Sequence, residues 1–471
     1  MSLKHEIAAY RAWKAGVAHT TLNPEGPGCV RIHLIPPRWL PFCHSPYVMI
    51  LNGYYILPLG YSWAALLGTF IQEVNRYEGR PMTEADLKQV MDTAVKKTRA
   101  VYRAPQKQIA DDLQEILSML YDVAHGHAPS VDSGAISLRS YARHMSAPHR
   151  MDLMISSMTS KDGSWNCNLK CRHCYAAGQP SAAKEELTTS QWKLIIDQCR
   201  KAGIPQLTFT GGEPTMRDDL AELVEYSRWF VTRLNTNGCR LTKKLCGALR
   251  EASLDSVQIT LYSDSPDIHN RLVGADLPGA AGNWWQTVTG LQNALAAGLN
   301  VSVNTPLCQD NRDYEHTLRF LHKEGVRYVT CSGLIETGKA SASPSLSSQI
   351  SVEEMGELLT SAAALCKEFG MELSFTSPGR ADAELLSKTG LTVPMCGACL
   401  SNMAVAPDGS VVPCQSWLSK DASLGNLLHT PWKSIWNHKT CARIRSMSEE
   451  TSLLCPLRTG YTQEGRGRHE S

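Results

Sequence analysis

The sequence has no excess of charge of either sign. Its 47 lysine and arginine residues nearly balance its 45 aspartate and glutamate residues, which leaves a formal net charge of +2. Proteins that bind nucleic acid or polyanionic surfaces usually carry a strong positive excess, so the composition gives those partners no support. The length of 471 residues and the apolar content of 43% instead describe a soluble globular protein of two or three domains.

The N-terminus lacks the apolar core of a secretion signal, because it begins Met-Ser-Leu-Lys-His-Glu. We therefore expect a cytoplasmic protein, in which the 16 cysteines stay reduced and available to metal.

One segment, Pro46 to Gln72, lacks charge and is long enough to cross a bilayer. It contains Asn52-Gly53 between two apolar stretches, which is the strongest short signal for a β-hairpin. Pro58 and Gly60 then interrupt any continuous helix. The segment therefore predicts a hairpin followed by a helix from about Ser62, and no membrane span.

Three cysteines, Cys167, Cys171 and Cys174, lie close together, and Tyr175 follows them. Such closely spaced sulfurs suit one iron–sulfur cluster, because its irons prefer soft thiolates. Three ligands leave one iron of a four-iron cube open. An open position on a metal indicates catalysis, whereas a closed shell indicates structure or electron transfer. A zinc knuckle is the alternative.

The spacing of these cysteines resembles the motif of the radical S-adenosylmethionine (SAM) superfamily. The resemblance implies a [4Fe-4S] cluster on Cys167, Cys171 and Cys174, whose open iron binds the amino and carboxylate groups of SAM. An electron from the cluster then cleaves SAM and releases a 5′-deoxyadenosyl radical. The resemblance also implies a flavodoxin- or ferredoxin-type reductant, and it includes Tyr175 among the SAM contacts.

A second motif is Gly211-Gly212-Glu213-Pro214, which directly follows the predicted strand 206–210. Glycines let the backbone approach a ligand closely, and the Glu213 carboxylate and nearby carbonyls can accept hydrogen bonds from an amine. The tetrapeptide resembles the GGEP motif of the family, which implies that it holds the methionine amino group of SAM.

Weaker candidates follow the later strands. Asn237 could hydrogen-bond a ribose hydroxyl or simply form a turn, and Thr260 and Asn304 end the fourth and fifth predicted strands. Many relatives carry a carboxylate clamp after the fourth strand. This chain has Asn270 and Val273 at the acidic and basic positions, so no clamp is assigned.

From Met151 onward, apolar runs alternate with helical segments, which is typical of a parallel sheet with right-handed crossovers. Six such units resemble the open (β/α)6 barrel of the radical SAM superfamily. In barrels of this kind the chemistry lies at the C-terminal ends of the strands, where the cysteine loop and Glu213 fall. The predicted strands are 152–158, 206–210, 230–234, 256–261, 300–304 and 328–331.

A second cysteine group lies near the C-terminus. Asp408-Gly409 predicts a hairpin turn that returns Cys414 to the pair Cys396 and Cys399. The group resembles the SPASM domain or its shorter twitch form. With Cys455 as the fourth ligand, the resemblance implies one saturated auxiliary [4Fe-4S] cluster for electron transfer or structural support.

The full SPASM pattern has a later cysteine-rich run that this chain lacks. Arg458 stands where a partner of Cys455 is expected. We therefore predict one auxiliary cluster, with Cys441 as an alternative ligand to Cys455. A structural zinc ion on the same cysteines is the competing interpretation.

Residues 1–145 predict a winged-helix-like α+β module, with a capping box from Thr83 to Asp86 and an amphipathic helix from Ile109 to Ala124. The module distantly resembles the PqqD-like peptide-recognition element fused to many peptide-modifying radical SAM enzymes. That resemblance implies that a leader peptide adds a strand to an open sheet edge. A cap or dimerisation domain is the alternative.

The predicted architecture is α/β: an N-terminal module (1–145), a partial (β/α)6 radical SAM core (146–380), a small iron–sulfur domain (381–460) and a disordered tail (461–471). The predicted activity is hydrogen abstraction from a ribosomally made peptide during its maturation. The alternatives are a small-molecule or haem-type cofactor precursor, oxidation of a protein residue as in sulfatase maturation, and a non-catalytic iron–sulfur carrier. The sequence does not predict an oligomeric state.

Overall fold

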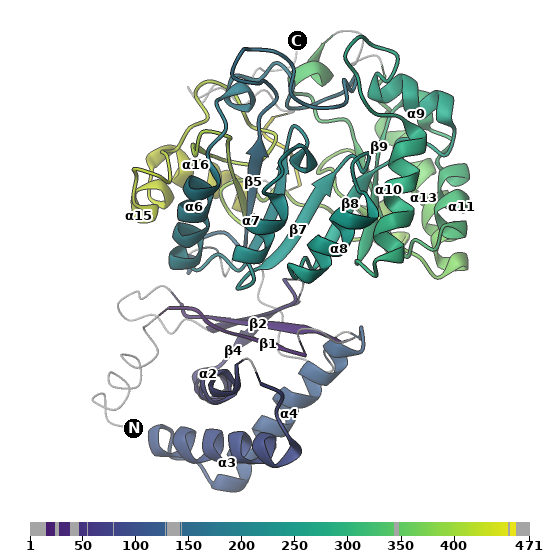
Figure 1. Ribbon diagram of the computed structural model, residues 1–471. Helices are drawn as coiled ribbons and strands as arrows, with labels where there is room; N and C mark the ends of the chain where they lie inside the picture. Colours follow the sequence, from purple (N-terminus) through teal and green to yellow (C-terminus); the bar gives the residue numbers. More distant parts are fainter. Residues whose placement is uncertain are drawn as a thin grey trace. The chain divides into compact units, whose positions relative to one another are not determined.

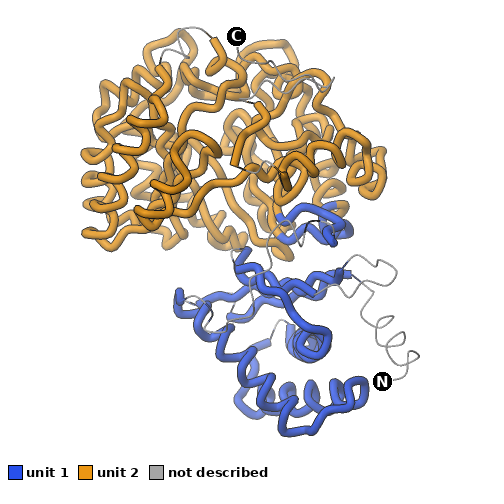
Figure 2. Tube along the Cα trace, turned by 180° about the vertical axis from the view of Figure 1, so that it is seen from behind, with its two compact units in different colours: residues 1–149, 199–205 blue, residues 150–198, 206–471 orange. Residues whose placement is uncertain are grey.

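The computed structural model describes residues 16–23, 28–37, 47–53, 55–78, 80–127, 129, 142, 144–342, 348–450 and 453–457. It forms two compact units: residues 1–149 with 199–205, and residues 150–198 with 206–471 (Figure 2). The predicted domain limits at 145, 380 and 460 remain predictions. Arg458 and the tail 461–471 lie outside the described residues.

The first unit begins with an antiparallel sheet in which the strands pair in chain order. Asn52 (φ 51°) and Gly53 (φ 68°) turn the chain between the last two strands, and both have the positive φ typical of a tight hairpin turn. The hairpin and helix predicted between Pro46 and Gln72 are therefore confirmed. No described helix is long and apolar enough to span a membrane. The strands are β1 (Ala18–Leu22), β2 (Val30–Ile35), β3 (Tyr47–Leu51) and β4 (Tyr55–Leu59).

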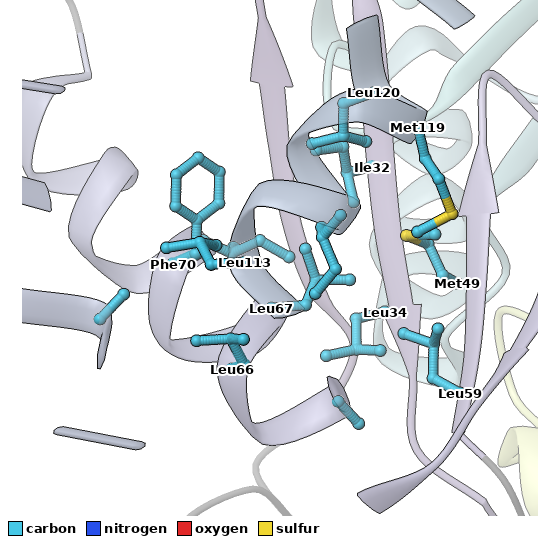
Figure 3. Packing of buried hydrophobic residues seen from close by; sticks show 14 of the residues in the cluster. Ile32, Leu34, Met49, Leu59, Leu66, Leu67, Phe70, Leu113, Met119 and Leu120 are labelled. Carbon is cyan, nitrogen blue, oxygen red and sulfur yellow. The ribbon is translucent and has the colours of Figure 1, made fainter. Parts of the chain in front are cut away.

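Helices cover this sheet, and their apolar residues form its core (Figure 3). Ile32 and Met49 of the sheet pack with Leu67 of α2 and Met119 of α4. The predicted capping box is present, because Thr83 Oγ1 accepts a hydrogen bond from the Asp86 amide (3.2 Å) and Asp86 accepts one from the Thr83 amide (3.0 Å). The helices are α2 (Tyr61–Val74), η1 (Asn75–Tyr77), α3 (Glu84–Val101) and α4 (Gln106–Ala124).

The second unit contains one open sheet in the order β11-β10-β9-β8-β7-β6-β5-β12-β13. The strands from β5 to β11 and the β5–β12 pair run parallel, and β13 is antiparallel to β12. All six predicted strands are confirmed; β11 was not predicted. The strands are β5 (Arg150–Ser156), β6 (Gln206–Gly211), β7 (Val231–Thr236), β8 (Ser256–Thr260), β9 (Val301–Leu307), β10 (Tyr328–Gly333), β11 (Glu372–Phe375), β12 (Asn402–Val405) and β13 (Val411–Val412).

Helices connect the parallel strands and lie on the outer face of the sheet (Figure 1). Because every strand from β5 to β10 runs in the same direction, the loops after them gather at one edge. The helical elements are η2 (Pro180–Ala183), α6 (Thr189–Ala202), η3 (Pro214–Met216), α7 (Leu220–Tyr226), α8 (Lys243–Glu251), α9 (Pro266–Val273), α10 (Trp284–Ala296), η4 (Gln309–Asn311), α11 (Tyr314–Lys323), η5 (Gly338–Ser341), α13 (Val352–Phe369), α14 (Ala383–Lys388), α15 (Trp432–Trp436) and α16 (Lys439–Glu450).

The C-terminal segment joins the edge of the barrel sheet. Strand β12 pairs with β5 in parallel, with Met403 opposite Met151. Because β5 leads directly into the first cysteine group, the two cysteine-bearing segments share neighbouring strands.

Candidate active site

The loop after β5 carries the first three cysteines, and the end of α9 holds its backbone. The Lys170 amide donates to the Val273 carbonyl (3.0 Å), and the Arg172 amide donates to that of Leu272 (2.9 Å). Gly274 follows at φ 66°, where an added Cβ would meet the Lys170 carbonyl oxygen at 2.6 Å. The end of α9, where no carboxylate clamp was assigned from the sequence, therefore supports the cysteine loop through its backbone.

The loop after β10 holds the other side of the cysteine segment. The Lys339 amide donates to the Cys174 carbonyl (3.0 Å), and Thr337 Oγ1 donates to the Tyr175 carbonyl (3.2 Å). Gly338 lies between them at φ 59°, and an added Cβ would lie within 2.7 Å of three carbonyl oxygens. Sequence reasoning did not identify this contact, because a single glycine in a polar loop gives no periodic signal.

The three thiols gather in a buried environment. Burial and the neighbouring Cys171 thiol hold the pKa of Cys167 well above its usual value, and burial likewise raises the pKa values of Cys171 and Cys174. Cys167 Sγ also lies 3.4 Å from the Gly212 carbonyl oxygen. Thiols in such a place become thiolates when a metal replaces their protons, so this donor set fits a thiophilic metal cluster.

Glu213 joins the ends of β6 and β7. Its carboxylate accepts hydrogen bonds from the Thr215 amide (3.0 Å), the Thr236 hydroxyl (2.6 Å) and the Asn237 amide (2.8 Å). Burial raises the pKa of Glu213, and these hydrogen bonds oppose that rise. The carboxylate is therefore held in a fixed orientation beside the cysteine loop.

The two glycines before Glu213 are needed because β5 lies directly beside them. A Cβ on Gly211 would meet the Ser156 carbonyl oxygen at 2.4 Å, and one on Gly212 would meet that of Ser157 at 2.8 Å. In the structure these glycines approach the backbone of the chain itself, and their expected close approach to a ligand stays a prediction.

The candidate residues after the later strands lie at the same edge. Asn237 Nδ2 donates to Asn168 Oδ1 (2.7 Å), next to Cys167. Asn304 Oδ1 accepts a hydrogen bond from Thr330 Oγ1 (2.9 Å), and Thr260 is the direct register partner of Asn304. Asn168 is buried beside the Cys239 thiol; burial raises the pKa of that thiol, and a hydrogen bond from the Asn168 side chain opposes the rise.

The second cysteine group also comes together. The turn at Gly409 (φ 86°) returns the chain, and the Cys399 amide donates to the Pro413 carbonyl (3.1 Å), directly before Cys414. Burial raises the pKa of Cys414, and the neighbouring thiols of Cys396 and Cys455 add to that rise.

Cys441, the alternative ligand, also lies in this group. The Cys399 thiol donates a hydrogen bond to it, and Arg445 Nη1 donates to its sulfur (3.6 Å). Among the described residues, no set of three or more His, Cys, Asp or Glu side chains is arranged to hold a single metal ion.

Gln179 connects the two cysteine-bearing loops. Its Nε2 donates to the carbonyl of Tyr175 (2.6 Å) and to that of Ser416 (3.0 Å), and its Oε1 accepts from the Leu418 amide (3.0 Å). Tyr175 lies close enough to both Cys174 and Cys414 for each to raise its pKa, although burial is the larger cause. A short hydrogen-bonded path thus runs between the two groups.

Comparison with known proteins agrees with this geometry. Residues 165–323 match the Radical SAM superfamily, and residues 396–456 match the SPASM iron–sulfur cluster-binding domain. The chain therefore contains a radical SAM domain and a SPASM domain. These domains imply SAM, a [4Fe-4S] cluster and auxiliary iron–sulfur binding as its cofactors.

Three relatives illustrate the range of similar proteins. An AdoMet-dependent heme synthase from Oleidesulfovibrio alaskensis is 29% identical over 308 residues, 62% of this chain and 76% of that protein. An Fe-coproporphyrin III synthase from Methanosarcina barkeri is 32% identical over 184 residues, 38% of this chain and 45% of that protein. The crystal structure of Streptococcus suis SuiB bound to precursor peptide SuiA matches with a TM-score of 0.58 at 13% identity, covering 89% of this chain and 94% of SuiB, which shows the shared fold.

Proposed function

We propose that this enzyme cleaves SAM reductively and uses the resulting radical to remove hydrogen from a peptide substrate. The observation that carries the proposal is the meeting of two motifs at one sheet edge: Cys167 Sγ lies 3.4 Å from the carbonyl oxygen of Gly212, directly before Glu213. This contact brings the predicted cluster ligands and the predicted amine-binding segment together.

The roles of the residues follow from their contacts. Cys167, Cys171 and Cys174 would hold the cluster, and the backbone bonds from Val273 and Lys339 would fix their loop. When bound there, the cluster supplies the electron that cleaves SAM to a 5′-deoxyadenosyl radical.

The remaining contacts would fix the position of SAM. Glu213, oriented by Thr236 and Asn237, would accept from its amine. The buried amide of Asn168, together with Tyr175, Thr260 and Asn304, would complete the polar contacts. In the C-terminal group, Cys396, Cys399, Cys414 and Cys455 would hold one auxiliary cluster, and Gln179 would connect the two loops.

The direct test is anaerobic incubation of the reconstituted protein with SAM and dithionite, followed by measurement of 5′-deoxyadenosine. We expect the wild-type protein to form this product and the Cys167→Ala variant to form none. A Cys246→Ala variant is the matched control, because Cys246 is buried in α8 and belongs to neither cysteine group. Equal product from the wild-type and Cys167→Ala proteins would refute the assignment.

The N-terminal unit supports a peptide as the substrate. Among the described strands, β4 pairs with β3 alone and forms one edge of the sheet. Pro58, opposite Val48, has no N–H, so this pair is not hydrogen-bonded, and by alternation neither is Ile56 with Ile50. The N–H and C=O of Ile56 therefore point away from β3, and its side chain is 46% exposed. A leader peptide could add a strand here, as the PqqD-like resemblance implies.

A peptide encoded beside the gene provides the test of this second step. We expect it to bind the full-length protein and to bind the Ile56→Pro variant more weakly, because proline removes the outward N–H of that residue. A Leu87→Pro change would disrupt a helix, so the matched control is Leu87→Gln, at an exposed position on α3. Binding that is unchanged in Ile56→Pro would exclude this edge as the docking strand.

A tetrapyrrole is the second candidate substrate, favoured by similarity to an AdoMet-dependent heme synthase and to an Fe-coproporphyrin III synthase. The match to the relative from O. alaskensis covers 76% of that protein's length. Incubation of the reduced protein and SAM with Fe-coproporphyrin III, followed by mass spectrometry of the porphyrin, distinguishes the two. Loss of mass from the porphyrin would support the tetrapyrrole and displace the peptide.

A further inference from the structure

The inner face of the barrel sheet is polar and partly reachable by solvent. Along β7, Leu234 is fully buried beneath the helices, whereas Arg233 and Asn235 on the other face are partly exposed. The same alternation continues through β8, β9 and β10. Their partly exposed inner positions include the polar residues Gln258, Thr260, Asn304 and Thr330.

Arg233 is a cation on this face that forms no ion pair among the described residues. Its Nη2 makes one long hydrogen bond to Ser302 Oγ (3.4 Å), and its Nε is buried without a partner. Asp152, the carboxylate that attracts Arg233, already forms an ion pair with Arg150 (2.9 Å). Burial lowers the pKa of Arg233 to about 10, so the guanidinium remains charged at neutral pH. Arg150 and Arg233 thus share one carboxylate, and a buried cation that is only partly compensated is costly, which favours a further anion beside it.

The strand register gives the height of this guanidinium within the barrel. Ser302, which Arg233 reaches, is opposite Gln258, and Gln258 is opposite Asn235. The Thr260–Asn304 pair lies two residues further toward the C-terminal edge, about 7 Å along the strands. The guanidinium therefore lies one step below residues that we assign to SAM.

Neighbouring polar atoms on the same face also lack partners. Thr208 Oγ1, on the residue opposite Arg233, and Asn235 Oδ1 are both buried without a hydrogen bond. We call Arg233, Asn235, Gln258 and Ser302 the inner-face patch. A molecule that entered the barrel would meet the positively charged guanidinium of Arg233, with hydroxyl and amide groups around it.

We propose that the inner-face patch binds a carboxylate of the substrate. This inference rests on the proposed radical chemistry at the C-terminal edge and adds the chemical class of the substrate. The planar guanidinium can bind a carboxylate through two hydrogen bonds. The Asn235 amide lies at the same level, as does the Gln258 amide, which uses one of its two N–H groups to donate to Thr330 Oγ1 (3.0 Å). The substrate is then a compound whose carboxylate lies a few bonds from the carbon that loses hydrogen. An acidic side chain of a peptide and a propionate of a tetrapyrrole share this chemistry.

The test measures how strongly binding depends on the carboxylate. Equilibrium dialysis of the reconstituted full-length protein with SAM would use two matched pairs of probes. One pair is Fe-coproporphyrin III and its tetra-amide; the other is the end-blocked peptides Ala-Glu-Ala and Ala-Gln-Ala. We expect the acid of at least one pair to bind at least about tenfold more tightly than its amide, because a charge-assisted pair is replaced by a neutral one.

Arg233 variants assign this preference to its side chain. The ratio of the affinity for the acid to the affinity for its amide should fall to about one in Arg233→Gln. In Arg233→Lys the ratio should lie between one and the wild-type value. It should be unchanged in Arg319→Gln, whose guanidinium is half-exposed on α11. The pair that shows the preference identifies the source of the carboxylate.

Two results would overturn the proposal: a ratio near one for both pairs in the wild-type protein, or a wild-type ratio that persists in Arg233→Gln. If Arg233→Gln does not fold, the affinity ratios of the wild-type protein and of Arg233→Lys test the proposal instead. Failure of the proposed function is separate, since it would appear as absence of 5′-deoxyadenosine from SAM without any substrate probe.

Discussion

Lys339 places a positive charge beside the first cysteine group, and removing that charge should lower the reduction potential of the cluster. The Lys339 amide is bonded to the Cys174 carbonyl, and its Nζ lies 4.7 Å from the centre of the Trp165 ring. This cation–π contact directs the ammonium group along the cysteine loop. Burial raises the pKa values of Cys171 and Cys174, and the charge of Lys339 opposes that rise, because it favours negative charge on those sulfurs.

The size of the effect follows from Coulomb's law. A unit charge about 8 Å from the added electron, with an effective dielectric constant of about 20 to 40, contributes about 1 to 2 kcal/mol. For a one-electron couple this corresponds to about 45 to 90 mV. Reduction adds negative charge, so the loss of a nearby cation makes reduction harder.

The assay is a potentiometric titration of the reconstituted protein monitored by electron paramagnetic resonance (EPR). Lys339→Gln should shift the midpoint potential of the SAM-binding cluster downward by that amount, whereas Lys339→Arg should shift it little. Lys388→Gln is the matched control, because this lysine is exposed on α14. A Lys339→Gln potential within about 10 mV of wild type would refute the electrostatic reasoning.

Three further predictions concern other residues. Burial holds His269 neutral with a pKa of about 4, and the unfolded chain binds the proton more readily, so stability should fall as the pH is lowered from about 6.5 to 4. His269→Gln should remove about 3 kcal/mol of that change in urea unfolding; an unchanged pH dependence would show that the buried ring is protonated in the folded state and contradict this. Gly338→Ala should lower the melting temperature and the retained iron more than Gly390→Ala, because Gly390 has open space at a similar φ (77°) and Gly338 does not; equal losses would contradict this. Cys455→Ser should roughly halve the bound iron and Cys441→Ser should not, as iron analysis would reveal; the reverse result would make Cys441 the ligand.

Much of the fold could be predicted because its signals are local. The six barrel strands are apolar runs bounded by helices, and the Asn52-Gly53 turn and the Thr83 capping box depend on a few adjacent residues. Strands β1, β2 and β11 were missed. β11 is four residues long and half-exposed, so its sequence shows little hydrophobic pattern.

The candidate site divides in the same way. Cys167 and Glu213 belong to compact motifs that are readable along the chain. The supports of the site are different, because the bonds from Val273, Lys339 and Gln179 join segments far apart in sequence. Arg233 was missed because a charged residue within a predicted strand is normally expected to face solvent. In the structure it lies on the inner face of the barrel sheet.

The central claim is that three thiolates leave one iron open for SAM. The most direct measurement is the EPR spectrum of the reduced, reconstituted protein, with Cys396, Cys399 and Cys414 changed to alanine so that the SAM-binding cluster is seen alone. The account predicts that added SAM changes the g values and that SAM labelled with ¹⁷O on its carboxylate broadens the signal. A spectrum that SAM leaves unaltered would contradict it.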